Sequence, residues 1–304
     1  MAFKPVQVSD LYQNILVQYV EPHVVEVRLN RPAKRNAINT RAWHEIGHAF
    51  SELLPREEKC RCILLTGSGK IFSAGIDLAS GLGGGDGGGP LTSIGQQNTD
   101  GAAKGLRTFR EGGAWQRAWK AINTCNKPVV AAIQKGCYGA ALEMICFADV
   151  RYCTADCIFS APEVDLGLAA DIGGNQIFPK IIGNDSFIRE VQLTGRKFTA
   201  QEAFQHGLVS KLCPDGTALR NDAMKVAVAI STKSPTATLG IKKMLNFTRD
   251  HTIDDSLEYA LTWNSMALQS NDMMEAGRAF ISKRPPTFSN IESLLEAKKI
   301  LGKL

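Results

Sequence analysis

The sequence predicts an α/β protein in two parts, an α/β core over residues 1–212 and a helical region over residues 213–304. Short apolar strands alternate with helices in the first part, and this order favours a mostly parallel sheet with crossover connections. Beyond residue 212 the apolar residues recur only with helical spacing. Hydrophobic residues make up 44% of the chain, so a sizeable core is available.

The strands of the core are predicted from short apolar runs bounded by turn residues. The first two, at residues 15–20 and 24–30, are close enough in sequence to form a hairpin. The other strands are predicted at residues 62–66, 128–133, 150–153 and 208–212. A helix is predicted at residues 40–54, because its apolar residues share one face. That face carries Trp43, Ile46, Phe50 and Leu53.

Six further helices are predicted in the second half of the chain from the same periodicity. They span residues 173–182, 185–193, 199–206, 217–233, 235–249 and 253–283. The third of them begins with Thr199 and Glu202, which have the spacing of a capping box. The helices after residue 212 therefore make up the predicted C-terminal region.

A glycine-rich segment at about residues 80–104 interrupts the core. Seven of the nine residues from Gly81 to Gly89 are glycine, and no apolar periodicity is present. Such a segment cannot bury enough surface to order itself, so it is predicted to be a mobile loop over the entrance of a site. A phosphate-binding loop would need a preceding strand, a following helix and another glycine spacing, so that class of site is excluded.

Composition and charge limit the classes of function. The net charge is +5 and the basic residues are spread along the chain, which disfavours a nucleic-acid partner and suits an anionic small molecule. The eight cysteines form no CxxC pair, so they are predicted to be reduced core residues. His44 and His48 lie four residues apart without a third ligand, and no metal site is predicted. No apolar run is long enough to predict a membrane span.

The two ends of the chain bear on its location. The N-terminal residues lack the apolar run of a signal peptide and the Arg- and Ser-rich composition of a transit peptide. Gly302-Lys303-Leu304 differs by one residue from the peroxisomal address Ser-Lys-Leu. We therefore expect a peroxisome or a related organelle. An ordinary exposed tail, with a mitochondrial or cytoplasmic location, stays open.

Two segments rich in small residues follow strands of the core, where α/β proteins build their sites. The first runs from Phe72 to Leu78 and contains Ser73, Ala74, Gly75, Ile76 and Asp77. Its small residues let a ligand approach the backbone N–H groups closely, although a tight turn also explains it when taken alone. The second runs from Lys135 to Glu143 and leads into a helix, whose N-terminus offers free N–H groups to a developing negative charge.

Three carboxylates stand out. Glu143 is in the first turn of a helix that is apolar nearly all round, so its carboxylate is expected to be buried, although a helix-start role also explains it. Glu163 follows a strand and a proline, and Asp171 comes eight residues later, as a functional acid or as the N-cap of the next helix. Apolar surroundings raise carboxylate pKa values, so these acids beside two N–H-rich turns suit proton transfer next to a carbonyl with an enolate intermediate.

At these residues the chain resembles the crotonase (enoyl-CoA hydratase/isomerase) superfamily over roughly residues 10–285. The matching motifs are Leu29-Asn30-Arg31-Pro32, Phe72 to Leu78, Lys127 to Ile133, Ala148 to Cys153, Pro162-Glu163 and Gly207 to Ser210. The resemblance implies a crotonase-like spiral of ββα units with a helical C-terminal region. It also implies assembly into a homotrimer or homohexamer, with residues 213–304 as the trimerisation region.

The resemblance further assigns the binding groups. It implies an acyl-CoA substrate, no separate cofactor, and an oxyanion hole formed by the N–H groups of Ile76 and Ala140. The family has Gly-Gly where Ala140 and Ala141 stand, so the added methyl groups narrow the approach but leave the N–H groups in place. The loop at Ala33, Lys34 and Arg35 matches the part of the family that meets the CoA nucleotide, and basic side chains suit its phosphates.

Within the superfamily, the segment from Glu163 to Asp171 is similar to that of the Δ3,5-Δ2,4-dienoyl-CoA isomerases, which carry two catalytic carboxylates at this spacing. The resemblance implies that a 3,5-dienoyl-CoA becomes a 2,4-dienoyl-CoA in fatty-acid β-oxidation. Hydratases use two glutamates at the positions of Glu143 and Glu163, whereas the dienoyl isomerases have aspartate in place of Glu143. A 2-enoyl-CoA hydratase is therefore the alternative. A non-catalytic RNA-binding or scaffold member of the fold is a further one, which the unclustered charge disfavours.

Overall fold

The computed structural model describes residues 3–81 and 100–291 of the 304-residue chain. A seven-stranded sheet forms the centre of this part, with the strand order β1-β2-β3-β4-β5-β7-β10. β2 (Ile15–Glu21) and β3 (Val24–Leu29) form the predicted antiparallel hairpin, with β1 (Val6–Gln7) at its edge. The remaining strands run parallel, as predicted, and are β4 (Cys62–Gly67), β5 (Val129–Ile133), β7 (Val150–Thr154) and β10 (Lys211–Cys213).

The last strand begins later than predicted. Residues 208 and 209 do not join the sheet, because the N–H groups of Leu208 and Val209 both donate to the carbonyl oxygen of Ala203 at the preceding helix. A second, three-stranded sheet consists of β6 (Gly136–Tyr138), β8 (Ile158–Ser160) and β9 (Phe198–Thr199). β6 and β8 follow β5 and β7 along the chain, so this small sheet carries the segments in which the sequence predicts the site.

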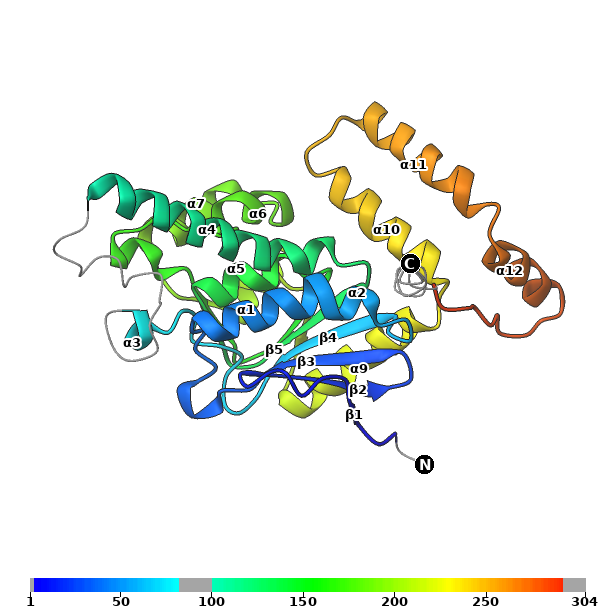
Figure 1. Cartoon of the computed structure of the whole chain (residues 1–304), viewed down its shortest axis with the longest axis horizontal. Helices are drawn as coiled ribbons and strands as arrows, with labels where there is room; N and C mark the ends of the chain where they lie inside the picture. The colour runs from blue at the N-terminus through cyan, green and yellow to red at the C-terminus, as the bar shows by residue number, and fades with distance from the viewer. Residues whose placement is uncertain (1–2, 82–99, 292–304) are drawn as a thin grey trace, which may run out of the picture.

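The two faces of the large sheet have different covers (Figure 1). On one face lies α9 (Gly216–Ser231), whose buried residues Leu219, Ala223 and Ala227 pack against the strands. On the other face lie α1 (Thr40–His48), α4 (Gly101–Thr124) and α5 (Ala140–Cys146). The predicted helix at residues 40–54 is present, because α1 continues through a π-helical turn (Ala49–Leu53) into α2 (Leu54–Arg56).

α4 is a difference from the prediction. It begins at Gly101, inside the segment expected to be a loop, and Asp100 caps it by accepting the N–H of Ala103 at 3.0 Å. Its four glycines and its mostly exposed first half hide the helix in the sequence, and only its last turns are buried, where Trp119 stacks on Trp43. Residues 78–81 form the short helix α3, and the rest of the predicted loop, residues 82–99, lies outside the described residues.

The second half of the chain is mainly helical, as predicted. Its helices before β10 are α6 (Gly174–Ile181), α7 (Asp185–Thr194) and α8 (Ala200–Gln205). After α9 come α10 (Pro235–Phe247), α11 (Ile253–Ala267) and α12 (Asn271–Ile281). The single helix predicted at residues 253–283 is two helices, because Ser270 accepts the N–H of Met273 and starts α12. The predicted capping box of Thr199 and Glu202 is present at the start of α8.

The eight cysteines are all buried and none forms a disulfide, which confirms the prediction of core residues. Within residues 3–81 and 100–291, no helix combines the length and the apolar character needed to cross a membrane. In the same part of the chain, no three His, Cys, Asp or Glu side chains gather closely enough to hold a metal ion.

A buried lysine anchors α10 to the core. Lys242 is 5% exposed, and its Nζ donates to the carbonyl oxygens of Ile122 and Lys127 at 3.0 and 2.9 Å. The same Nζ donates to Oδ2 of Asp149 at 2.8 Å, and that oxygen also accepts the N–H of Val129. One side chain therefore joins α10 to the end of α4 and to the start of β5.

Replacing this anchor should destabilise the protein. Lys242→Met should lower the free energy of unfolding by about 3–5 kcal/mol, because Asp149 and two carbonyl groups lose their buried partner. Lys243→Met, on the exposed side of the same helix, should change it by less than about 0.5 kcal/mol. Denaturant unfolding followed by circular dichroism measures both variants, and equal losses in the two would contradict the role of Lys242.

Candidate active site

The two N–H-rich turns predicted from the sequence lie side by side. Ser73 and Cys137 form a parallel β-bridge, in which the N–H of Ser73 donates to Gly136 O and the N–H of Tyr138 donates to Ser73 O. Gly75 has a φ of +84°, and a Cβ there would lie 2.6 Å from Tyr138 O. Only glycine permits this approach, so the segment after β4 is held against the segment after β5.

Each turn presents one backbone N–H group that is free of internal bonds. Around Ile76, the N–H groups of Gly75 and Asp77 donate to Ser73 Oγ and Ile38 O. Ala140 is the first residue of α5, where helical N–H groups have no partner inside the helix. Among the residues that the structure describes, the N–H groups of Ile76 and Ala140 donate no hydrogen bond. This is the pair that the resemblance assigns to the oxyanion hole.

Glu163 lies directly against the second turn. It comes from a 3₁₀-helix (Pro162–Leu166) that follows β8, and its Oε1 is 3.0 Å from where a Cβ on Gly139 would stand. Its Oε2 is buried and has no hydrogen-bond partner in the described part of the chain. Burial is the main cause that raises the pKa of Glu163, and the charge of Asp171 adds to it. A buried carboxylate oxygen without a donor is suited to accepting a proton.

Glu143 is buried, as the apolar helix predicted, with 2% of its surface exposed. Its Oε2 accepts the N–H groups of Ile172 at 3.1 Å and Gly174 at 2.6 Å. Burial raises the pKa of Glu143 to about 8, and the charges of Glu163 and Asp171 raise it further, against the lowering effect of the two N–H donors. The carboxylate therefore ties α5 to the start of α6.

Asp171 is not the N-cap of the helix that follows it, so that interpretation is wrong. Gly173, with a φ of +140°, takes the N-cap position, and α6 begins at Gly174. The side chain of Asp171 is partly exposed, its pKa is raised by burial, and its backbone oxygen accepts a bond from Gln116 Nε2 at 2.8 Å. It lines a cavity of about 410 Å³, which Gln116 and Phe147 also line.

The three carboxyl groups influence one another, since the charge of Asp171 raises the pKa of both glutamates and the charge of Glu163 raises that of Glu143. They come from three different elements, α5, the 3₁₀-helix after β8 and the segment before α6. Each carboxylate has a raised pKa, and burial is the largest cause in each case. Glu143, with a pKa of about 8, is suited to exchanging a proton near neutral pH.

The loop that the resemblance assigns to CoA is fixed to the first turn. Ala33, Lys34 and Arg35 are exposed, and the carbonyl oxygen of Arg35 accepts the N–H of Ala74 at 2.9 Å. Arg31 at the start of the loop forms an ion pair of 2.9 Å with Asp77. The loop and the first turn therefore form one unit.

Asn36 organises this unit, a role that was not predicted from the sequence. Its Nδ2 donates to the carbonyl oxygens of Ser68, Ile71 and Phe72, and its Oδ1 accepts the N–H of Arg31. Its own carbonyl oxygen accepts a bond from Ser73 Oγ at 2.8 Å. Asn36 has a φ of +54°, a conformation that asparagine adopts more readily than most residues. An asparagine directly after the basic loop was therefore the sequence signal for a turn at this position.

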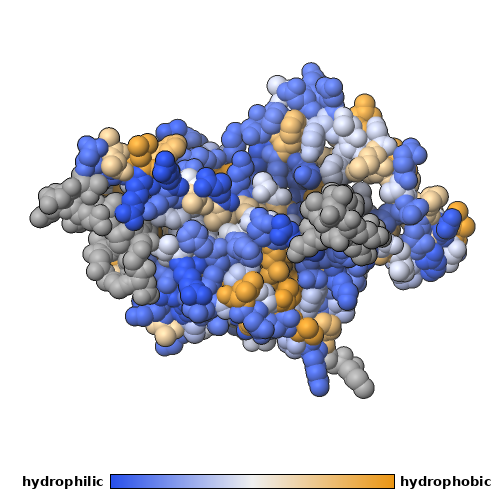
Figure 2. Space-filling model, viewed as in Figure 1, coloured by the Kyte–Doolittle hydropathy of each residue, from blue (hydrophilic) through white to orange (hydrophobic). Residues whose placement is uncertain are grey.

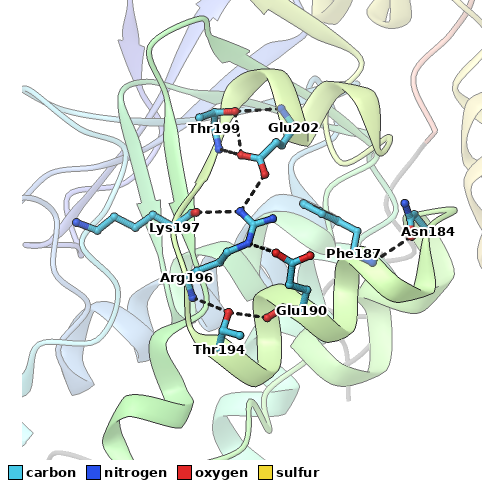
Figure 3. A network of polar contacts seen from close by, with 8 residues as sticks. All are labelled: Asn184, Phe187, Glu190, Thr194, Arg196, Lys197, Thr199 and Glu202. Carbon is cyan, nitrogen blue, oxygen red and sulfur yellow. Dashed lines mark hydrogen bonds and ion pairs between the residues drawn. The ribbon is translucent and has the colours of Figure 1, made fainter.

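A polar network centred on Arg196 joins the end of α7 to the start of α8 (Figure 3). Arg196 lies between Glu190 and Glu202, at 2.6 and 2.9 Å, and Glu202 closes the capping box with Thr199. The network fixes the turn that contains Gly195, whose carbonyl oxygen accepts Ser160 Oγ at 2.9 Å. Because Ser160 ends β8, the strand that leads to Glu163 is held in place.

The raised pKa of Glu143 predicts a pH-dependent stability. Its carboxyl binds its proton more tightly in the folded chain, so the stability it contributes is present below pH 4.5 and is lost as the pH rises through about 8. Glu143→Gln lacks this titration. Between pH 5 and pH 8 the free energy of unfolding of the wild type should fall relative to that of the variant, as measured by denaturant unfolding. The exposed control Glu258→Gln should follow the wild type; parallel curves for Glu143→Gln would refute the shift.

Two named proteins are similar to this chain over most of its length. The mitochondrial Delta(3,5)-Delta(2,4)-dienoyl-CoA isomerase of Mus musculus is 39% identical over 292 residues, which are 94% of this chain and 86% of that protein. The peroxisomal Delta(3,5)-Delta(2,4)-dienoyl-CoA isomerase of Arabidopsis thaliana is 36% identical over 91% of this chain and 96% of that protein.

The fold has solved counterparts, which confirms the predicted crotonase-like fold. The enoyl-CoA hydratase of Bacillus anthracis superposes with a TM-score of 0.79 at 25% identity, over 91% of this chain and 99% of that one. The family model described as enoyl-CoA hydratase/isomerase matches residues 20–291. The chain belongs to the enoyl-CoA hydratase/isomerase family.

Proposed function

We propose that this protein isomerises 3,5-dienoyl-CoA to 2,4-dienoyl-CoA. The observation that carries the proposal is Glu163, whose buried Oε2 has no partner in the described residues and whose Oε1 lies against Gly139, next to the free N–H of Ala140. Asp171, on a separate loop, is near enough for its charge to raise the pKa of Glu163. The names of the mouse and Arabidopsis relatives support it, since both are called isomerases of this reaction. Fatty-acid β-oxidation is the metabolic setting that this reaction implies.

The reaction needs one proton removed and one delivered. Glu163, ionised, takes the proton from C2 of the substrate, and the electron pair spreads over the conjugated chain to the thioester oxygen. The N–H groups of Ile76 and Ala140 stabilise that oxygen, and one such donor is typically worth about 3–4 kcal/mol. Asp171, protonated at the start, delivers its proton to C6, which leaves double bonds at C2 and C4. The raised pKa of Asp171 favours the protonated form that this step requires.

Glu143 acts in this proposal as a positioning residue. Its carboxylate holds the N–H groups of Ile172 and Gly174, on either side of the turn that follows Asp171. It therefore sets the place of Asp171 rather than moving the substrate's proton. No cofactor is needed in this scheme, because the thioester acidifies C2 and the protein supplies the acid and the base.

A second candidate function is 2-enoyl-CoA hydration, and one observation favours it. Glu143 and Glu163 stand at the positions of the two glutamates of a hydratase. The charge of Glu163 raises the pKa of Glu143, which is consistent with a pair acting together. In that case one carboxyl group would activate a water molecule for addition, and the other would donate a proton to the substrate. The isomerase is favoured because Asp171 has no role in the hydratase reaction.

The CoA nucleotide is proposed to lie along the loop of Ala33, Lys34 and Arg35. The side chains of Lys34 and Arg35 are exposed, and basic groups pair well with phosphates. Ser73, Ala74, Gly75, Ile76 and Asp77 then form the wall between this loop and the thioester. The substrate would thus run from an exposed basic loop to the carboxyl groups of Glu163 and Asp171.

The location and the domain division are also proposals. The mouse relative is mitochondrial and the Arabidopsis relative is peroxisomal by name, and we infer an organelle location for this chain. The tripeptide Gly302-Lys303-Leu304, which prompted the peroxisomal prediction, lies outside the described residues. We keep residues 1–212 as the core and residues 213–304 as the region of assembly, of which α9 covers the sheet.

Self-association is proposed through α11 and α12, as a homotrimer or homohexamer. Figure 1 shows both helices extending away from the sheet, and Figure 2 shows hydrophobic residues on the surface of this arm. Large apolar side chains of the arm are exposed, namely Ile253, Leu257, Leu261, Met266, Leu268, Met273, Met274, Phe280 and Ile281. An exposed apolar surface of this extent is typical of a protein–protein interface.

The isomerase proposal predicts a specific loss. Asp171→Asn should lower kcat with 3,5-dienoyl-CoA by about 10²–10⁴-fold, because it removes the proton donor for C6. Asp165→Asn changes an exposed carboxylate of the same segment and should keep the activity. Absorbance of the conjugated product measures both. Survival of isomerisation in Asp171→Asn would exclude the assignment, and water addition to 2-enoyl-CoA as the only wild-type activity would establish the hydratase.

The assembly proposal predicts a change of mass. Leu257→Glu combined with Leu261→Glu places two charges on the exposed face of α11, where these side chains are 64% and 70% exposed. Sedimentation velocity should then show a smaller species than the wild type, because charge is excluded from an apolar interface. Leu193→Glu, at a 72% exposed leucine of α7, is the control and should keep the wild-type mass. An unchanged mass in the double variant would rule out this surface.

A further inference from the structure

A second cavity lies on the opposite face of the sheet from the carboxylates. Its volume is about 510 Å³, within the range of small-molecule sites. It is bounded by the carboxyl ends of β3, β4 and β5 and by the first turns of α9 (Figure 1). The lining residues that carry the inference are Arg28, Gly67, Ser68, Gly216 and Arg220. The carboxyl end of a parallel sheet is where α/β proteins place ligands.

The charge of this cavity is positive. Arg28 and Arg220 are its only charged lining residues in the described part of the chain. Beneath them lies Glu26, fully buried, which accepts bonds from both arginines and from Thr66 Oγ1 at 2.9 Å. Burial raises the pKa of Glu26, but the bonds and charges of Arg220 and Arg28 outweigh it and hold the pKa at about 2. Two permanent cations therefore face one permanent anion.

The guanidinium groups of Arg28 and Arg220 have N–H groups that donate no hydrogen bond within the described residues. Each carries five N–H bonds, and in the described residues each donates hydrogen bonds only to Glu26, through one terminal nitrogen. The Glu26 carboxylate thus holds both guanidinium groups at the wall of the cavity and leaves most of their N–H groups free to donate. Gly216 begins a 16-residue helix; the N-cap Asp215 accepts the N–H of Ala218 at 2.8 Å, and the N–H of Gly216 itself has no partner inside the helix.

We propose that this cavity binds a phosphate-bearing small molecule, at a site separate from the one that holds the carboxylates. Paired arginine forks match phosphoryl oxygens, and the dipole of α9 favours the same charge. The cavity has room for a phosphate ester or a diphosphate.

The site can be tested without disturbing the Glu26 cluster. A Cβ at Gly216 would meet no atom within 4 Å, so Gly216→Asp has room, and a carboxylate at a helix N-terminus favours the fold. It places a negative charge at the cavity, whereas Gly216→Asn has the same shape and no charge. Lys34→Ala weakens the proposed CoA loop on the other side and controls for phosphate bound there.

Calorimetric titration with pyrophosphate decides the matter. We expect binding in the wild type, about tenfold or more weaker binding in Gly216→Asp, and near wild-type binding in Gly216→Asn and Lys34→Ala. Malonate, a dicarboxylate of similar charge, should bind less tightly than pyrophosphate. Thermal unfolding should show that all three variants remain folded.

Three results would overturn the proposal. They are no binding of pyrophosphate by the wild type at millimolar concentration, equal binding by Gly216→Asp, or loss of binding in Lys34→Ala alone. Tighter binding of malonate would overturn the ligand class. None of these outcomes bears on the isomerase assay, so the two proposals fail separately.

Discussion

The pairing of the segment after β4 with the segment after β5 is the constraint on which the site depends. The bridge between Ser73 and Cys137 continues the parallel order of the large sheet beyond its edge, and Gly75 makes the close approach sterically possible. It brings two N–H groups together that are 64 residues apart in sequence, those of Ile76 and Ala140. Asn36 then joins the basic loop to the same segment, so the proposed CoA loop and the proposed oxyanion hole share one frame.

Around this frame the three carboxyl groups divide their roles through their surroundings. Glu143 has two backbone donors, Glu163 has a buried oxygen with none, and Asp171 reaches the surface. Three ionised carboxylates in one apolar region would repel one another, so each raises the cost of ionising its neighbours. Protonation of at least one of them is the consequence, and a site that holds one acid and one base at the same pH meets the requirement of a proton-shifting reaction.

The sequence contains the local part of this arrangement but not the distant part. The strands, the capping box at Thr199 and the burial of Glu143 follow from nearby residues, because periodicity and capping are local properties. The bonds from Glu143 to Ile172 and Gly174 cross about thirty residues and leave no pattern in either segment. α4 was not predicted, because its glycines lower its helix propensity. Tertiary packing of its last turns around Trp119 stabilises the helix nonetheless. The cavity of Arg28 and Arg220 joins residues 192 positions apart, so only the fold reveals it.

Glu26 and Glu143 show why the two faces of one sheet support different chemistry. Both side chains are almost fully buried, yet the pKa of Glu26 is about 2 and that of Glu143 about 8. Glu26 is neutralised by two guanidinium cations, whereas Glu143 has only backbone N–H dipoles and two acidic neighbours. Burial raises the pKa of both groups, and at Glu26 the two guanidinium partners outweigh it and reverse the direction of the shift. A carboxylate whose pKa is about 2 stays ionised near neutral pH, so it suits the anion site proposed on its face, whereas the proton transfer proposed for this protein needs the raised pKa values of Glu143, Glu163 and Asp171.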